Sequence, residues 1–432
     1  MKSKLLVNPV TLICHFFLIY YCLYDLTTVY SRIGATNANL LILLLLAFLF
    51  ALGVMLLLKK SVYFNASSIS WLPFLILLLY QTYLGYCNKT YFLIFCVFAI
   101  VIFVRRIEDK YWDRLVKYFI GISIWAAIGV FVQLAIPSLH KLIISIFFNE
   151  EGVRYVASYA SNGYYSGFFH QVGDTAFYLS IGILAVLFFG ENVRYKKILI
   201  TILSLALIVE GKRSLVLFLL AAVFIVYISK GKQTQKINRI AMIIVAVAIL
   251  YVILREVSFA FSNIKFFEKI AYTISYLEEG NIDGLLFQSG RSWIYELAKS
   301  LYSGNSLTGI GWANFSKSYS SIYGHATSVH NIYLQLLCET GIIGLISFLI
   351  GAITSLIISF RNIRNIEWIN SNDENHLGKL ASISLSGQVL FLLLGFVENP
   401  LYNENCLLAY LIFVIIAFFL QYRINNPDEI CD

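Results

Sequence analysis

The stretch HNIYLQLLCETGIIG, from His330 to Gly344, combines residues that could do acid–base chemistry with an apolar helical pattern. Asn331, Gln335 and Glu339 recur every four residues, so we expect them on one face of a helix. A histidine is suited to accept a proton near neutral pH, and a carboxylate inside a membrane helix is a functional candidate by default. His330 and Glu339 are therefore candidate catalytic residues, whereas the two amides are also explained as contacts between helices.

Basic residues stand where the surrounding pattern does not explain them. The turn EGKRS (210–214) places Lys212 and Arg213 at the start of an apolar segment, on the side of the membrane that should be poor in basic residues. Arg291 begins the helical pattern RSWIYELAKSLY, where a cation is unfavourable for the helix dipole. Guanidinium groups suit phosphate. These residues predict an anion-binding site; the alternatives are lipid-headgroup anchors and an ordinary loop arginine.

Three further polar residues lie beside apolar segments. His170 ends the motif GFFH before a segment that begins near residue 172, and Arg154 lies upstream in EGVRY. An aromatic belt with a helix cap formed by His170 and Gln171 explains this region equally well. Glu398, in VENP, is a second carboxylate that could orient the histidine or replace it.

Membrane helices must position these residues. Hydrophobic residues make up 59% of the 432-residue chain and charged residues only 13%; a soluble protein carries about twice that charge. We expect an all-α, polytopic membrane protein, one domain over residues 1–432, whose first helix is retained and not a cleaved signal peptide. Twelve helices are predicted near 10–26, 38–58, 69–86, 90–104, 115–137, 172–190, 197–210, 214–229, 239–257, 332–360, 379–398 and 404–422.

The basic residues also predict an orientation. With the N-terminus in the cytoplasm, most Lys and Arg residues of the short loops fall on the cytoplasmic side. Two long segments, an outer loop over 138–171 and a large outer loop with short helices over 258–330, then lie on the opposite side. Long connections usually carry function. We therefore expect an active face outside the cytoplasm, out of reach of ATP and nucleotide sugars.

Several other classes of function are disfavoured. The seven cysteines contain no CxxC pair, which argues against a metal site and a disulfide framework. No Walker A or GxGxxG motif is present. The net charge of +8 is spread over short loops, so we expect no nucleic-acid partner. Membrane lipids are the expected surroundings.

The motif His-Asn-x9-Gly-x-x-Gly, formed by His330, Asn331, Gly341 and Gly344, resembles the signature of the O-antigen ligase and polymerase superfamily of bacterial envelope enzymes. The segments SGRSW (289–293), GIGWANF (309–315), GFFH (167–170) and the basic turn are similar to parts of that family. The resemblance covers residues 150–360 by motif and the rest by topology. It implies a GT-C-like, metal-independent glycosyltransferase without a cofactor, a multi-pass protein of the bacterial cytoplasmic membrane.

The resemblance also implies roles. Donor and acceptor would be glycans carried by undecaprenyl diphosphate, and a chain-length regulator and a flippase would be protein partners. Arg213 and Arg291 match positions that hold the donor diphosphate, with Lys212 and Arg154 as further candidates. His330 matches the position that contacts or deprotonates the acceptor hydroxyl. The two guanidinium groups would replace the metal that many nucleotide-sugar transferases hold with Asp-x-Asp, a motif that this chain lacks.

Three functions remain compatible with these patterns. A composition rich in Ile, Asn, Tyr, Phe and Lys favours a polymerase of lipid-linked repeat units, of O-antigen or capsule type. The alternative is a ligase that transfers finished glycan to lipid A–core or another acceptor. A repeat-unit flippase is a further alternative, but it should carry charges at both depths of the membrane, whereas the candidates here gather near the outer face.

Overall fold

The computed structural model describes residues 66–85, 109–190, 195–230, 233–263, 265–281, 290–366 and 374–426. All regular elements in these ranges are helices, which confirms the all-α class. Six of the described helices are long and apolar enough to cross a membrane. The helices predicted near 10–26, 38–58 and 90–104 lie outside the described residues, so the count of twelve stays a prediction.

The described ranges contain α-helices and two 3-10 helices. In chain order they are η1 (Ala66–Trp71), α3 (Leu72–Tyr83), α5 (Asp109–Ala135), α6 (Pro137–Phe147), α7 (Glu150–Ser161), α8 (Val172–Phe189), α9 (Lys196–Glu210), α10 (Arg213–Ser229), α11 (Gln233–Ala260), α12 (Lys265–Glu278), α14 (Arg291–Gly304), α15 (Asn314–Tyr323), α16 (Ile332–Ile366), α17 (Glu374–Leu394), η3 (Pro400–Tyr402) and α18 (Glu404–Asn425).

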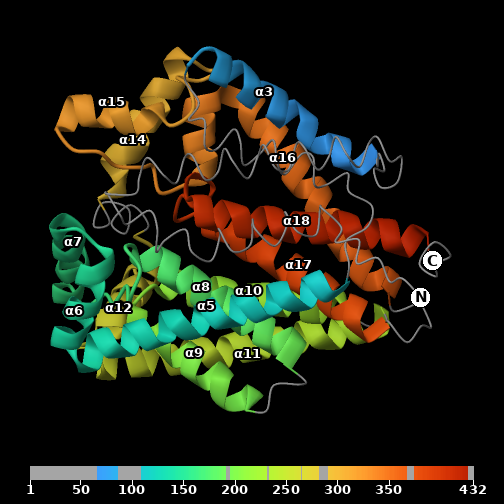
Figure 1. Cartoon of the computed structure of the whole chain (residues 1–432), viewed down its shortest axis with the longest axis horizontal. Helices are drawn as coiled ribbons and strands as arrows, with labels where there is room; N and C mark the ends of the chain where they lie inside the picture. The colour runs from blue at the N-terminus through green and yellow to red at the C-terminus, as the bar shows by residue number, and fades with distance from the viewer. Residues whose placement is uncertain are drawn as a thin grey trace, which may run out of the picture.

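The core lies where α17 packs against α10 and α18, and α8 against α5 and α9. These helices run side by side along the long axis of the molecule (Figure 1). Phe391 of α17 stacks on Tyr410 of α18 with ring centroids 4.1 Å apart, and Trp112 of α5 contacts Phe419 of α18. One end of this long axis is formed by α6, α7, α12, α14 and α15 (Figure 1).

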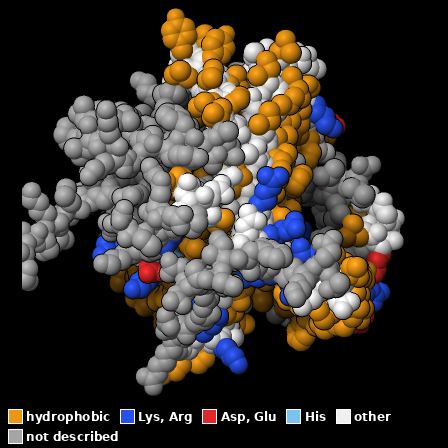
Figure 2. Space-filling model, turned by 90° about the vertical axis from the view of Figure 1, so that its right-hand side faces the viewer, with side chains coloured by type: hydrophobic (Ala, Val, Ile, Leu, Met, Phe, Trp, Pro, Cys, Tyr) orange, Lys and Arg blue, Asp and Glu red, His pale blue; other side chains and the backbone are white. Residues whose placement is uncertain are grey.

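Basic side chains mark the opposite end. Figure 2 looks onto this end and shows Lys and Arg gathered over it with few acidic side chains among those drawn. Arg364 lies in the last turn of α16, Arg423 in the last turn of α18, and Lys196 begins α9. The predicted orientation places this end in the cytoplasm, because lysine and arginine concentrate there in membrane proteins.

The two long segments contain helices. Segment 138–171, expected as an outer loop, holds most of α6 and all of α7. Pro137 stands at the first position of α6, which favours a helix start, and the Asn149 side chain accepts a hydrogen bond from the Gly152 N–H at the start of α7. Segment 258–330 holds the end of α11 and α12, α14 and α15.

The end of α17 differs from the prediction. The sequence pattern predicts a helix over 379–398, but α17 ends at Leu394. The Gly395 carbonyl accepts a hydrogen bond from the Ile332 N–H (2.8 Å) and so does not continue the helix. Pro400 then begins the 3-10 helix η3. Glu398 consequently lies in a loop next to the start of α16.

A break divides the helix predicted over 332–360. Gly341 has φ 65° and ψ −171°, a combination open to glycine. The chain around 306–310 fills the break, where Ile342 N–H donates to Ser306 O (2.9 Å). A Cβ atom at Gly341 would lie 2.1 Å from Leu307 O. The backbone of the 306–310 segment therefore approaches Gly341 closely, whereas Gly344 faces side chains.

Candidate functional site

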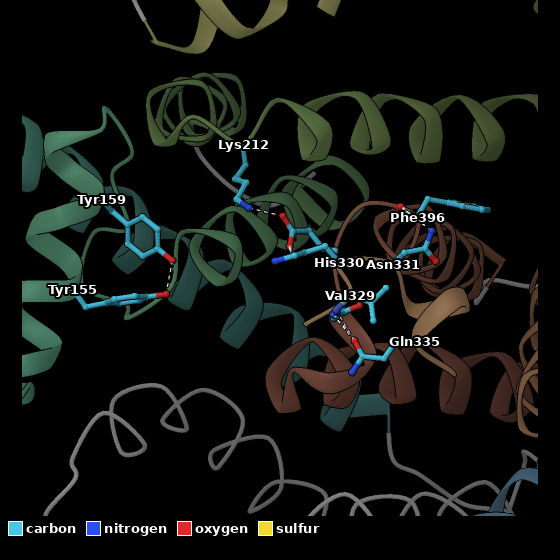
Figure 3. Close-up of polar contacts among 10 residues, drawn as sticks. Tyr155, Tyr159, Lys212, Val329, His330, Asn331, Gln335 and Phe396 are labelled. Atoms are coloured by element: carbon cyan, nitrogen blue, oxygen red, sulfur yellow. Dashed lines mark hydrogen bonds and ion pairs between the residues drawn. The ribbon is translucent and has the colours of Figure 1, made fainter. Parts of the chain in front are cut away.

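The His-Asn pair is held against the loop after α17 by three successive contacts. Ile332 N–H donates to Gly395 O. The Asn331 amide donates to Phe396 O over 3.3 Å. His330 Nδ1 lies 3.1 Å from a carboxylate oxygen of Glu398. The beginning of α16 and the loop that carries Glu398 are therefore fixed to each other, residue by residue (Figure 3).

His330 has an unusual backbone conformation. Its φ is 57°, in the left-handed region that Ala313 also adopts. Such a conformation costs about 1–3 kcal/mol and occurs preferentially at functional sites. Asn331 follows as the cap of α16, because its side-chain oxygen accepts a hydrogen bond from Leu334 N–H (3.0 Å). The helix thus begins after His330, so the His330 side chain is not part of the polar stripe formed by Asn331, Gln335 and Glu339.

Glu398 is shared between His330 and Lys212. One carboxylate oxygen faces the histidine, and the other lies 2.5 Å from Lys212 Nζ. The side chains of Lys212 and Glu398 are 28% and 22% exposed. Burial raises the pKa of Glu398, but Lys212 and His330 outweigh it and hold this pKa well below its usual range. The carboxylate therefore stays ionised beside the histidine.

The turn that carries Lys212 is fixed by Glu210, which sequence analysis did not single out. Lys212 N–H donates to the Glu210 carboxylate over 2.8 Å, and Gly211 between them has φ 99°. Tyr165 N–H donates to Glu210 O (3.3 Å), and a Cβ atom at Gly211 would meet the Tyr164 ring at 3.0 Å. The chain after α7 therefore packs directly on this turn.

Three cations converge at the turn. Arg213 begins α10 and donates a hydrogen bond to the Lys269 carbonyl of α12. Arg291 begins α14, and its charge acts on both Lys212 and Arg213. Burial lowers the pKa of Lys212, but Glu398 and Glu210 outweigh burial and hold this pKa above its usual value. Since the charge of Lys212 is matched by Glu398, the two arginines supply the excess positive charge.

Glu339 is buried away from solvent. Its carboxylate accepts hydrogen bonds from Ala313 N–H (2.8 Å) and Phe315 N–H (3.0 Å), at the start of α15. The Gln335 amide donates to it as well (3.1 Å). Among the described contacts none joins Glu339 to His330. The structure pairs the histidine with Glu398 instead.

Arg154 lies apart from this cluster. It is on α7 and pairs with Glu150 one turn earlier (3.2 Å), and its side chain is 79% exposed. The contacts of the described residues do not connect it to Arg213 or Arg291. An exposed pair of this kind contributes little binding or stability.

The GFFH motif is bonded to α5 and ends in His170. Gly167 N–H donates to the Gln133 side chain of α5 (2.7 Å), and Phe168 and Phe169 are buried. His170 stacks on Tyr155 of α7 with centroids 4.6 Å apart, and burial lowers the pKa of this imidazole. Gln171 stands at the cap position of α8, but its side chain makes no capping hydrogen bond, contrary to the prediction.

Residues 198–349 match the family described as O-antigen ligase. The predicted resemblance to the O-antigen ligase and polymerase superfamily is thereby confirmed over these residues. The matched range contains Lys212, Arg213, Arg291 and His330, whereas Glu398 and α7 lie outside it. No curated protein sequence matches the chain.

The match to this family implies a glycosyltransferase-like membrane enzyme with lipid-linked glycan substrates. The matched family does not separate polymerases from ligases. In the described ranges no three His, Cys, Asp or Glu side chains are grouped as metal ligands. Metal independence stays a prediction.

Proposed function

We propose that this protein polymerises lipid-linked oligosaccharide repeat units of O-antigen or capsule type. It would transfer the growing glycan from undecaprenyl diphosphate to the non-reducing end of a new lipid-linked repeat, on the outer side of the bacterial cytoplasmic membrane. The observation that carries the proposal is the pairing of His330 with Glu398 beside Arg213 and Arg291. The composition favours a polymerase over a ligase.

His330 is the proposed general base. With Glu398 accepting a hydrogen bond from Nδ1–H, the lone pair of Nε2 is free to accept the proton of the acceptor hydroxyl. The acceptor oxygen forms a bond to the anomeric carbon of the donor, and the bond from that carbon to the diphosphate oxygen breaks. The proton stays on Nε2 until solvent removes it. The ionised Glu398 stabilises the imidazolium that forms.

The arginines are the proposed diphosphate site. Undecaprenyl diphosphate leaves with the electron pair of the broken bond, so negative charge grows on its oxygen in the transition state. Guanidinium groups fixed at the starts of α10 and α14 would stabilise this charge. Lys212 would act through Glu398, and Glu339 would support the loop before α15 without touching the substrate.

The decisive experiment is a gel of surface polysaccharide from cells that lack the gene, complemented with wild type or variants. A polymerase null leaves single repeats on the acceptor and no ladder. His330→Ala and Arg291→Ala should reproduce this null while Arg154→Ala, a change at an exposed arginine, restores the ladder. Membrane fractionation of each variant checks insertion.

Other outcomes would identify the alternatives. Long chains that stay on the lipid carrier indicate a ligase, and single repeats trapped on the cytoplasmic side indicate a flippase. A full ladder from His330→Ala would exclude this histidine as the base. With the purified protein, a loss of elongation on adding EDTA would contradict the replacement of a metal by arginines.

A further inference from the structure

Two tyrosines and a histidine form an aromatic cluster on the face of α7 that borders the site. Tyr155 and Tyr159 lie one turn apart, and their hydroxyl groups are 2.6 Å from each other. Their rings meet edge to face, with centroids 4.8 Å apart. His170 stacks on the Tyr155 ring almost in parallel, at an angle of 17°. This cluster, Tyr155–Tyr159–His170, is called the tyrosine platform below.

The tyrosine platform adjoins the His330–Glu398 pair. The chain after α7 is bonded to the Glu210 turn through Tyr165, and that turn presents Lys212 to Glu398. The charges of Glu398 and Asp174 both act on Tyr159. Both tyrosine side chains project from α7 toward the side of the site where Lys212 and His330 lie (Figure 3).

The platform is open to a ligand. Tyr155 is 40% exposed although His170 covers one face of its ring. Tyr159 and His170 are half-buried, so packing and hydrogen bonding hold the ring of Tyr155 in place. A fixed aromatic face with two hydroxyl groups at its edge can bind a flat patch of C–H bonds and the polar groups around it together.

We infer that the tyrosine platform binds a sugar residue of the glycan, with the pyranose ring on Tyr155 and sugar hydroxyls on the hydroxyl pair of Tyr155 and Tyr159. The inference rests on the proposed function. A sugar fits this surface because its C–H face is apolar and its rim consists of donors and acceptors. A lipid chain would offer the hydroxyl pair no hydrogen bond beyond the one within the pair, so its remaining donor and acceptor sites would stay unused, which is unfavourable. The sugar comes either from the donor glycan or from the acceptor repeat.

The test measures binding without turnover. The probe is the free repeat oligosaccharide, released by mild acid from the lipid carrier of cells that lack the gene and added to the purified full-length protein. Tyr155→Ala should weaken binding about tenfold, and Tyr155→Phe, which keeps the ring, roughly threefold. Tyr227 is a matched control: it is 43% exposed and lies at the other end of α10 from Arg213. Tyr227→Ala should leave the affinity unchanged.

A second probe separates the platform from the proposed diphosphate site. Inorganic diphosphate should bind Tyr155→Ala as it binds wild type, and should bind Arg291→Ala more weakly. If His330→Ala were active in cells while Tyr155→Ala still lost oligosaccharide binding, the proposed chemistry would fail and the sugar site would stand. Equal oligosaccharide affinity of wild type and Tyr155→Ala, or no binding by wild type, would overturn the inference.

Steady-state kinetics then distinguish the two sources of the sugar. A raised KM for the lipid-linked single repeat with an unchanged KM for the lipid-linked long chain places the acceptor on the platform. The reverse pattern places the donor glycan there. If neither KM changes in Tyr155→Ala, the platform does not bind the glycan.

Discussion

The Nδ1 atom of His330 lies 3.1 Å from Oε2 of Glu398, although 68 residues separate them in the chain. The contact exists because α16 begins where the loop after α17 passes, and main-chain hydrogen bonds hold the two together. We therefore propose that the two residues act as one unit, comparable to a histidine oriented by a carboxylate in a hydrolase.

Removing either partner of this unit tests it. We expect Glu398→Gln to lower the rate of chain elongation by up to about 10⁴-fold, the loss seen when the carboxylate that orients a histidine base is replaced by an amide. His330→Ala should lose about 10²- to 10⁴-fold, the usual contribution of a general base. The double variant should be no slower than His330→Ala, because residues that act together are not additive. Independent, multiplying losses would show that the two act separately.

Gly341 should tolerate no side chain. Gly341→Ala would place Cβ 2.1 Å from the Leu307 carbonyl and force a residue with a side chain to φ 65°. We expect the unfolding temperature in detergent to fall by about 5 °C or more. Gly304→Ala is the matched control, since its Cβ would meet nothing within 4 Å. Equal unfolding temperatures for the two variants would contradict the observed contact between the 306–310 segment and the break in α16.

Glu339 should affect stability more than catalysis. In the wild type, Ala313 N–H and Phe315 N–H donate to different oxygens of the Glu339 carboxylate. In Glu339→Gln only one side-chain oxygen remains to accept these hydrogen bonds. Because a hydrogen bond to a charged group contributes about 1.5–3 kcal/mol, the free energy of unfolding should fall by an amount of that order. Elongation at low temperature should fall less than tenfold. Abolished elongation with an unchanged unfolding temperature would return Glu339 to the catalytic candidates.

Local pattern singles out the candidate residues of the site, but it does not show how they pair. His330, Arg213 and Arg291 stand out because each occupies a helix start where its residue type is unusual. The ion pair of Lys212 with Glu398 joins residues 186 positions apart, and no local periodicity encodes it. The sequence therefore predicts Lys212 as a diphosphate ligand without showing that its ammonium group pairs with Glu398.

The polar stripe and the two tyrosines are a second case in which the sequence does not predict the contacts that residues make. Gln335 and Glu339 lie in α16 and Asn331 caps it. Each of the three meets a different part of the chain: the Phe396 carbonyl for Asn331, Asn399 for Gln335 and the start of α15 for Glu339. The stripe therefore holds loops in place. In the sequence alone, Tyr155 and Tyr159 resemble an aromatic belt at a membrane surface. Their position relative to Glu398 depends on how α7 packs, which the local sequence does not show.

The pH dependence of stability follows from the Glu398–Lys212 pair. Glu398 has a lowered pKa in the folded protein, so its contribution is present above the ordinary glutamate value of about 4.3 and is lost as pH falls through the lower folded value. Lys212 has a raised pKa, so its contribution is present below about 10.4 and is lost as pH rises through the higher folded value. The coupling free energy should thus be constant from about pH 5.5 to 9.5.

A double-variant cycle with Glu398→Gln and Lys212→Gln, read by thermal unfolding in detergent at several pH values, measures this coupling. The coupling should decline below about pH 4. The exposed pair of Arg154 with Glu150 is the control: its coupling should fall when salt is raised to about 1 M, whereas the partly buried pair should change less. A coupling for Glu398 and Lys212 that titrates between pH 6 and 9 would mean that one of them loses its charge near neutral pH, and Glu398 would then be unable to orient His330 as an ionised partner.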